Sequence, residues 1–504
     1  MIPVSGQCVV HSATLRGVEA VPVEVEVVVG NGMPGMFIVG MPDAAIQESR
    51  ERVRAAIRTS GFSMPNERVV VNLAPGSLRK TGSGFDLPIA VGILIATGQV
   101  DPSHARDRLL VGELSLEGAV RPVSGILAYA LCARSAGCDV VCAQPDGGCV
   151  RVEGVEQLIA ASLSSFRTGD FPAGRRACAP EAASSPDFSD IAGHEMAKRA
   201  LQIAAAGGHG VLMMGPPGSG KTMLASRLPS ILPPLSEGEA FQTALIHSVA
   251  GEDPAPAFNG VRPFRSPHHS ASSAGLIGGG SPPRPGEISL AHNGVLFLDE
   301  LAEFKPSVLQ GLRQPLESGR VVITRADGNV AFPARFMLVA ASNPCPCGYL
   351  GDPERECVCG IPRIRAYRNR IGGPLMDRID IHIDVRRIAP GEVLATGRGT
   401  ASEKLREDVL RAREFASWRR AREREEEGMR KKRGTAQLVG SCRLSGEDEG
   451  FFEQAARRNG MSGRAIMRTL SVARTVADME ESARVERPHL CEALAFRVRE
   501  GEGS

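Results

Sequence analysis

Apolar and polar residues follow patterns that divide the first 165 residues into short strands and helices. Between Val21 and Val29, valine at every second position alternates with glutamate, which predicts a strand with one face in water. Apolar residues at helical spacing over Ala44–Ser60 predict an amphipathic helix, and the apolar run Asp86–Thr97 predicts a buried helix. The same reasoning predicts strands at Val69–Leu73 and Val140–Cys142, a hairpin from Leu109–Glu113 and Ala119–Pro122, and a helix at Ile126–Ala136. Residues 1–165 are therefore expected to form an α/β domain.

Three unbroken apolar runs lie in the middle of the chain: Val211–Met214, Gly294–Leu298 and Phe336–Ala340. Such runs are typical of strands that are covered on both faces, as in a parallel sheet. A helix is expected at Glu195–Ala206, a strand at Ile381–Val385, and a β-hairpin over residues 316–331 with its turn at Asp327-Gly328. We expect an α/β core at 189–390, joined to the first domain by a linker at 166–188 that is rich in Pro, Ala, Gly and Ser.

The last part of the chain, residues 391–504, is expected to be a small helical domain. Residues 403–433 are strongly charged, and apolar residues occur only in the first half, which predicts an amphipathic helix there. The second half, Arg419–Arg433, is either a solvated helix or a disordered connector. Three further helices are expected at Leu444–Arg457, Gly463–Glu480 and Leu490–Arg497.

Composition limits the class of protein. The length of 504 residues suggests about three domains. The net charge of +2 means that any nucleic-acid surface must be local. The start of the chain has no secretory pattern, and the longest membrane-like run, Leu87–Val100, falls short of the roughly 18 residues that a span requires. We expect a cytoplasmic protein that does not enter membranes and has no disulfide framework.

A phosphate-binding loop follows the first of the three apolar strands. The stretch Gly215-Pro216-Pro217-Gly218-Ser219-Gly220-Lys221-Thr222 fits the pattern G-x-x-x-x-G-K-[ST]. The glycines let successive backbone N–H groups point at one anion, and the helix that begins near Lys221 adds its partial positive charge. Lys221 is expected to reach the β- and γ-phosphates of ATP, and the Thr222 hydroxyl to ligate Mg²⁺.

Polar side chains end the other two strands. Asp299 and Glu300 follow Leu298, at the end where parallel sheets place ligands. Asp299 is expected to hold Mg²⁺ through its water shell, and Glu300 to polarise the attacking water. Asn343, after the third strand, is expected to position that water. Together these residues predict ATP hydrolysis.

Four cysteines, Cys345, Cys347, Cys357 and Cys359, form a C-x-C-x₉-C-x-C pattern. Four thiolates can surround one tetrahedral Zn²⁺, although the spacing within each pair is tighter than usual. The alternative is a loop with free cysteines, and the sequence does not decide between the two.

Two segments are candidates for contact with DNA. The stretch Arg262–Ala271 is too rich in Pro to be core, and its Arg265, His268 and His269 are expected to contact phosphates or bases. In the predicted hairpin, Arg320 and Arg325 are the corresponding candidates, with ordinary solvated arginines as the alternative.

The first domain resembles the proteolytic domain of Lon proteases over Lys80–Pro88, Gly112–Gly118 and Arg121–Gly125. In that alignment the serine nucleophile falls at Gly84 and the lysine base at Leu127, and Ser83 is one position away. A Ser–Lys mechanism needs both a hydroxyl and an amine, so peptidase activity is not expected. An interaction module and a structural scaffold remain as alternatives.

Several segments together closely resemble the magnesium-chelatase-like AAA+ ATPases, and the resemblance spans nearly the whole chain: Gly215–Thr222, Ile246–Gly251, Arg262–Ser270, Pro285–Gly294, Leu312–Glu317, Asn343–Gly348 and Asp377–Asp380. It implies an AAA+ core with a Lon-like first domain and a C-terminal helical lid. It also implies a hexameric, ATP-driven helicase for branch migration of single-stranded or branched DNA in natural transformation. A chelatase motor for porphyrin metallation and a protein-remodelling ATPase are the alternatives.

The same resemblance assigns roles to two arginines. Arg378 is expected to reach the γ-phosphate of the neighbouring subunit, with Arg370 as a substitute, which requires an oligomer. Arg464 is expected to contact the nucleotide from the helical lid, with Arg468 and Arg474 as alternatives.

Overall fold

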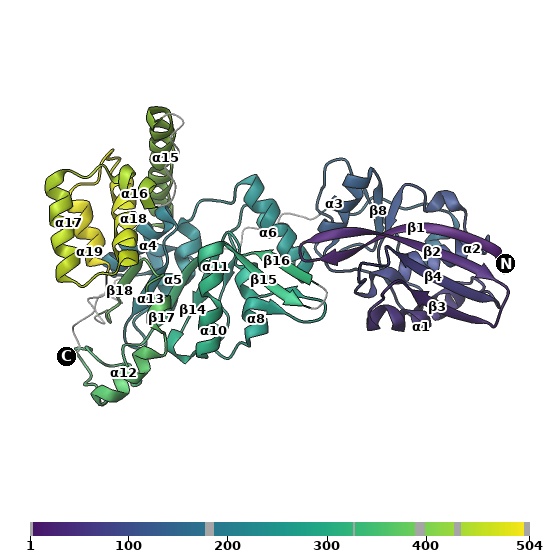
Figure 1. Ribbon diagram of the computed structural model, residues 1–504, viewed down its shortest axis with the longest axis horizontal. Coiled ribbons are helices and arrows are strands. Elements are labelled where there is room, and N and C mark those ends of the chain that lie inside the picture. The colour runs from purple at the N-terminus through teal and green to yellow at the C-terminus, as the bar shows by residue number, and fades with distance from the viewer. Residues whose placement is uncertain (1–3, 177–185, 326–327, 389–398, 428–434, 498–504) are drawn as a thin grey trace.

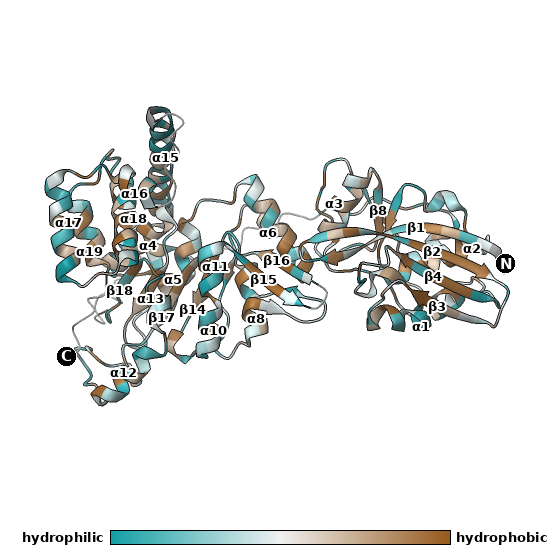
Figure 2. Cartoon of the chain, in the orientation of Figure 1, coloured by the Kyte–Doolittle hydropathy of each residue, from teal (hydrophilic) through white to brown (hydrophobic). Residues whose placement is uncertain are grey.

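The computed structural model describes residues 4–176, 186–325, 328–388, 399–427 and 435–497. Three regions follow one another along its length: an N-terminal α/β part, a central sheet with helices on both faces, and a C-terminal group of helices (Figure 1). Hydrophobic residues are concentrated in the strands, where they alternate with hydrophilic ones in parts of the N-terminal sheet, whereas hydrophilic residues gather on outer helices such as α15 (Ser402–Glu427) and α17 (Gly446–Arg458) (Figure 2).

The N-terminal part is built on a seven-stranded sheet in the order β3-β4-β2-β1-β5-β8-β9. Strand β2 pairs antiparallel with both β1 and β4, and every other pairing in the sheet is parallel. The alternation that predicted β2 is confirmed, because Val23, Val25 and Val27 are buried. The bounds are β1 (Val4–Arg16), β2 (Glu19–Gly30), β3 (Gly35–Val39), β4 (Arg68–Ala74), β5 (Arg108–Leu110), β8 (Asp139–Cys142) and β9 (Gln157–Ile159).

The predicted helices of this part are confirmed as α1 (Ala44–Thr59), α2 (Asp86–Ala96) and α3 (Ile126–Ala136). The predicted hairpin is confirmed in part. Strands β6 (Glu113–Leu114) and β7 (Val120–Arg121) pair with each other, whereas Leu109 lies in β5 of the main sheet. Packed structure also continues past residue 165, since Phe166 and Phe171 are buried with ring centroids 4.7 Å apart.

The central part contains a five-stranded sheet in the order β11-β14-β17-β10-β18, parallel throughout. Its strands are β10 (Val211–Met214), β11 (Phe264–Arg265), β14 (Val295–Leu298), β17 (Met337–Ser342) and β18 (Ile381–Asp384). Alternate residues pack on opposite faces: Val211 and Met213 join one core with α4 (Glu195–Gly207) and α5 (Lys221–Ile231), and Leu212 joins a second with α10 (Pro306–Gly311). The expected two-sided burial of these strands is thereby confirmed.

The predicted hairpin of the central part is present as β15 (Arg320–Arg325) and β16 (Gly328–Pro333), and the first residue of its predicted turn pair, Asp327, lies outside the described residues. One side of this hairpin meets the N-terminal part. Val18, in the turn between β1 and β2, packs on the same apolar cluster as Val330, and a Cβ added at Gly17 would lie 3.0 Å from Val330 Cγ1. The β1–β2 turn therefore covers part of the hairpin.

A second contact joins the N-terminal part to the central part. Helix α3 packs on α6 (Glu237–Ala250), where the Gly125 N–H donates to Ser248 O at 2.7 Å and the Leu127 N–H to Ser248 Oγ at 3.3 Å. Leu127 is 1% exposed and shares an apolar cluster with Ala240 and Ala244. The two parts are thus joined by a buried, mainly apolar contact between α3 and α6.

The C-terminal part consists of α15 (Ser402–Glu427), α16 (Thr435–Cys442), α17 (Gly446–Arg458), α18 (Gly463–Met479) and α19 (Arg487–Ala495). The interpretation of Arg419 as the start of a solvated segment is wrong. Its guanidinium is buried and pairs with Asp478 of α18 at 2.8 Å. The helix continues to Glu427, and residues 428–433 of the predicted connector lie outside the described residues.

Candidate active site

The proposed nucleotide residues gather at one edge of the central sheet. Strands β10, β17 and β14 are neighbours and parallel, with Met214 opposite Ser342 and Leu298 opposite Ala340. The segments that follow these strands therefore leave the sheet side by side. They carry the phosphate loop, Asn343 and the Asp299-Glu300 pair.

The phosphate loop has the backbone that its glycines predict. Gly218 and Gly220 have φ of 77° and 86°, a region that favours glycine, and a Cβ at Gly215 would lie 2.1 Å from Val385 O. Pro216 and Pro217 complete the turn, and Ser219 is buried. Helix α5 begins at Lys221, so its first N–H groups face the loop.

The Lys221 ammonium lies inside this loop. It donates to Gly215 O at 2.8 Å, to Pro216 O at 2.9 Å and to Asn343 Oδ1 at 3.4 Å. Burial lowers the pKa of Lys221, and the carboxylates of Asp299 and Glu300 oppose that shift. An anion seated on the loop would give this ammonium a charged partner in place of backbone carbonyls.

Thr222 and Asp299 form a pair of oxygen donors beside the lysine. Thr222 Oγ1 donates to Asp299 Oδ2 at 2.8 Å. A hydroxyl and a carboxylate at this distance suit Mg²⁺, which prefers oxygen ligands. The structure therefore brings Lys221, Thr222, Asp299 and Asn343 together, and their chemical roles stay predictions.

Glu300 has an unusual backbone for a glutamate. Its φ is 51°, in the left-handed region, and its N–H donates to Asp299 Oδ1 at 2.9 Å. Non-glycine residues held in this region concentrate at functional sites. The side chain is half exposed and pairs with His269, whose Nδ1 lies 3.2 Å from Glu300 Oε2. No motif in the sequence indicated this contact.

Arg378 lies at the opposite edge of the same sheet. Together with Arg464 it lines a cavity with His209 and Asp380, which lie within two residues of the starts of strands β10 and β18. The phosphate loop follows β10, so a complete strand separates the two arginines from Lys221. Arg378 also pairs with Glu317 and donates to Pro374 O.

Arg464 lies beside Arg378 in this cavity, away from the phosphate loop of its own chain. Its guanidinium lies 3.8 Å from the Glu317 carboxylate that also holds Arg378. The two alternatives have other partners: Arg468 pairs with Asp380, and the buried Arg474 pairs with Asp478 at 3.2 Å. The contact of Arg464 with a nucleotide stays a prediction. The substitute for Arg378, Arg370, pairs with Glu303 at 3.4 Å.

The candidate DNA residues divide into two groups. The Arg265 guanidinium pairs with Glu287 at 2.7 Å and with Glu252 at 3.1 Å, so its charge is already partnered inside the chain, and its contact with DNA stays a prediction. His269 faces Glu300, and His268 lies beside it with ring centroids 4.0 Å apart. Arg320 and Arg325 are exposed on β15 and remain candidates.

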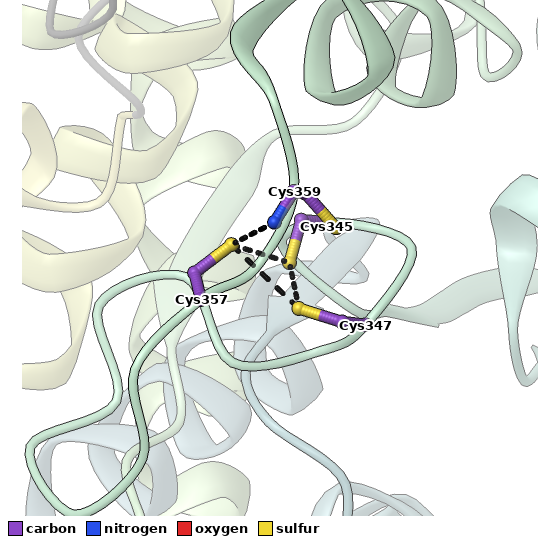
Figure 3. Close-up of side chains that lie close together, drawn as sticks. All are labelled: Cys345, Cys347, Cys357 and Cys359. Atoms are coloured by element: carbon purple, nitrogen blue, oxygen red, sulfur yellow. Dashed lines mark hydrogen bonds between the residues drawn. The ribbon is translucent and has the colours of Figure 1, made fainter.

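The four cysteines of the C-x-C-x₉-C-x-C pattern converge. The sulfurs of Cys345, Cys347, Cys357 and Cys359 all lie within 4.8 Å of one another, and Figure 3 shows them meeting in one loop. Three of the separations are 3.4 to 3.6 Å. A tetrahedral Zn²⁺ with bonds of about 2.3 Å sets its sulfurs roughly 3.8 Å apart, so the donor set fits that ion. Backbone N–H groups of Tyr349 and Val358 lower the pKa of Cys347 to about 6.

An arginine that sequence reasoning missed connects this loop to the phosphate loop. Arg387 Nη2 donates to Pro217 O at 3.3 Å, and Arg387 also pairs with Asp352 at 3.3 Å and Glu354 at 3.7 Å. It follows β18 in no recognised motif, so its role is visible only in three dimensions. Within the described residues, no helix combines the length and apolar character needed to cross a bilayer.

Three family models match the chain. They are described as magnesium chelatase subunit ChlI at residues 187–393, subunit ChlI of Mg-chelatase at 25–145, and magnesium chelatase subunit ChlI C-terminal at 399–497. Among relatives, competence protein ComM of Haemophilus influenzae is 41% identical over 503 residues, covering 97% of each chain. Protein YifB of Escherichia coli is 40% identical with the same coverage. The magnesium-chelatase 67 kDa subunit of Chlorobaculum parvum is 31% identical over 230 residues, which is 44% of this chain and 31% of that protein.

Proposed function

The chain belongs to the magnesium chelatase subunit ChlI family. From this membership we propose that it is an AAA+ ATPase that assembles into a hexameric ring and moves DNA. One observation carries the proposal. Lys221, Thr222, Asp299 and Asn343 meet at one edge of the central sheet, and Arg378 lies at the other. A complete site then needs two subunits.

The proposed mechanism assigns one task to each residue. Lys221 binds the β- and γ-phosphates, Glu300 accepts a proton from the attacking water, and Asn343 orients that water. Thr222 and Asp299 would hold Mg²⁺, which, when bound, neutralises charge on the phosphate oxygens. Arg378 of one subunit, with Arg464 beside it, approaches the γ-phosphate in the next subunit. His269 holds the Glu300 carboxylate beside this site.

The DNA substrate is proposed from the relatives and from the exposed arginines. The Haemophilus relative, similar over 97% of both chains, is called a competence protein, and competence is the capacity of a bacterium to take up DNA. Arg320 and Arg325 would contact the strand from hairpin β15–β16, since both are exposed. We propose branch migration of single-stranded or branched DNA during natural transformation as the activity. The similarity to the chelatase subunit covers only 44% of this chain, compared with 97% for the competence protein. The comparison therefore supports a chelatase motor less strongly than a DNA motor.

The outer parts of the chain are proposed to support this motor. We assign residues 1–165 to a Lon-like domain without peptidase activity, because Gly84 has no hydroxyl and Leu127 no amine. Ser83, one position from Gly84, donates its hydroxyl to Glu113. Residues 391–504 would form the helical lid. The four-cysteine cluster would hold one Zn²⁺, because its sulfur spacing fits that ion.

The deciding experiment measures ATP turnover by the purified full chain. Branched DNA, protoporphyrin with Mg²⁺, and an unfolded protein are added in separate reactions. Stimulation by branched DNA alone supports the proposal, and stimulation by protoporphyrin or unfolded protein alone selects one of the rival functions. The Lys221→Ala variant is the control, and it should lose turnover with every additive. A wild-type protein that hydrolyses no ATP under any of these conditions would overturn the proposal.

A further inference from the structure

The four-cysteine loop begins next to a residue of the proposed nucleotide site. Asn343, which accepts a hydrogen bond from Lys221, is two positions before Cys345. Cys345 is 0% exposed, so the start of the loop is fixed in the interior. From there to Gly360 the chain forms neither a helix nor a strand. A loop of this length within a compact domain needs some other source of order.

The loop contacts the phosphate loop through a glycine. Gly348 has φ of 86°, and a Cβ at this position would lie 2.6 Å from Pro217 Cδ. The backbone of the cysteine loop therefore packs directly on the turn that would surround the phosphates. Any side chain at Gly348 would push Pro217 away or strain the backbone.

Arg387 supplies a second connection. Its guanidinium donates to Pro217 O at 3.3 Å and pairs with Asp352 and Glu354 of the cysteine loop. It also lies 5.5 Å from the centre of the Tyr349 ring, and Arg355 covers that ring at 4.1 Å. Pro217 is thus held by the cysteine loop at Gly348 and, through Arg387, at Asp352 and Glu354.

The four cysteines are the feature that closes this loop on itself. Cys345 and Cys347 lie at its start and Cys357 and Cys359 at its end, with all four sulfurs within 4.8 Å. A metal ion bound here joins the two ends, and its binding free energy becomes folding free energy of the loop. Without the ion, Gly348, Asp352 and Glu354 would lose the cross-link that keeps them against Pro217 and Arg387.

We propose that a Zn²⁺ ion on the four cysteines braces the phosphate loop, so that nucleotide binding depends on metal loading. This inference rests on the proposed function, because it assigns a regulatory role at the proposed ATP site. The ion takes no part in hydrolysis. It fixes the positions of Asn343 and Pro217, and a displacement of about 1 Å in such a site can reduce activity by two orders of magnitude.

The test compares three variants of the full chain with the wild type. Cys357→Ser removes a ligand at the far end of the loop, and Cys491→Ser is the matched control, because Cys491 is exposed on α19 outside the cluster. Gly348→Ala keeps every ligand and disturbs the contact with Pro217. For each protein, zinc content is measured by elemental analysis and nucleotide affinity with a fluorescent ATP analogue. ATP turnover is measured separately.

We expect Cys357→Ser to lose zinc and to bind nucleotide at least about tenfold more weakly. Gly348→Ala should keep zinc and still bind nucleotide more weakly, and Cys491→Ser should match the wild type in both measurements. Since Cys357→Ser can fail to fold, the wild type is also stripped with a chelator. Adding Zn²⁺ back should restore nucleotide affinity. In a separate sample, Co²⁺ added to the stripped protein should give the visible absorption of a tetrahedral thiolate site.

Two results would overturn the brace: a wild-type protein that contains no zinc and takes up none, or a zinc-free protein that binds nucleotide with wild-type affinity. The readouts also separate this proposal from the proposed function. If nucleotide affinity depends on zinc but the wild type does not hydrolyse ATP, the brace stands and the ATPase proposal fails. If the wild type hydrolyses ATP and the stripped protein binds nucleotide equally well, only the brace fails.

Discussion

The separation of Arg378 from the phosphate loop leads to a test with mixed subunits. Arg378 lies at the amino edge of the central sheet and Lys221 at the carboxyl edge, so one chain cannot bring them to the same phosphate. The two variants Arg378→Ala and Lys221→Ala should each assemble and hydrolyse ATP very slowly. Loss of an arginine of this kind costs about three to five powers of ten in rate.

A one-to-one mixture of the two variants should recover activity. In a randomly mixed ring, half of the subunits keep Lys221, and half of those face a neighbour that keeps Arg378. About a quarter of the sites are then complete, so turnover should approach about a quarter of the wild-type rate. The assay is steady-state ATP hydrolysis with branched DNA, after the mixed proteins are dissociated and reassembled.

The matched control is Arg370→Ala, since Arg370 is the other arginine near this position and forms a half-exposed pair with Glu303. It should retain most of the activity. The reasoning fails if the mixture stays as inactive as either variant while tagged subunits are shown to exchange. A loss of activity in Arg370→Ala together with an active Arg378→Ala would transfer the role to Arg370.

Three further changes test other contacts. Arg265→Met should cost about 2–4 kcal/mol of stability, because Glu287 loses its partner, and leave DNA affinity unchanged; weaker DNA binding without thermal destabilisation would contradict this. Arg419→Met should lower the free energy of unfolding, measured by chemical denaturation, by about 2 kcal/mol. This loss is smaller than is usual for a broken buried ion pair, because Asp478 still pairs with Arg474. An unchanged free energy of unfolding would refute the prediction. Burial lowers the pKa of His292 to about 4, so its contribution to stability should fall by about 3 kcal/mol from pH about 6.5 towards pH 4, and His292→Gln should reduce the pH dependence of the unfolding free energy by that amount, leaving the share of His382, whose pKa burial also lowers to about 4.

The features that could be predicted from the sequence depend on residues close together in the chain. The strand-turn-helix of the phosphate loop is specified within twelve residues, from Val211 to Thr222, and the structure contains it. The alternation in β2 and the apolar run in β14 are likewise local. Strand β1 was not predicted, because its sequence mixes polar and apolar residues without a clear pattern. It is stabilised as a strand by pairing with β2 along nearly its whole length.

The contacts that were missed join distant segments. His269 meets Glu300 from a proline-rich loop, and Arg387 reaches Pro217, 170 residues earlier in the chain, from the segment after the neighbouring strand β18. The position of Arg464 beside Arg378 depends on how the C-terminal helices pack on the sheet, which no local spacing encodes. The ion pairs of Arg265 could not be predicted because its two carboxylate partners, Glu252 and Glu287, are 13 and 22 residues away.

The buried apolar contact between α3 and α6 has a consequence for experiments with truncated forms of this protein. Leu127 is the residue that aligns with a peptidase lysine, and here it is sealed against Ala240 and Ala244. A truncation that removes the first 165 residues would expose this face of α6 to solvent, together with the neighbouring side chains of Phe241 and Leu245. The isolated motor would then be prone to aggregate, so its failure to work alone would say little about what the front of the chain contributes.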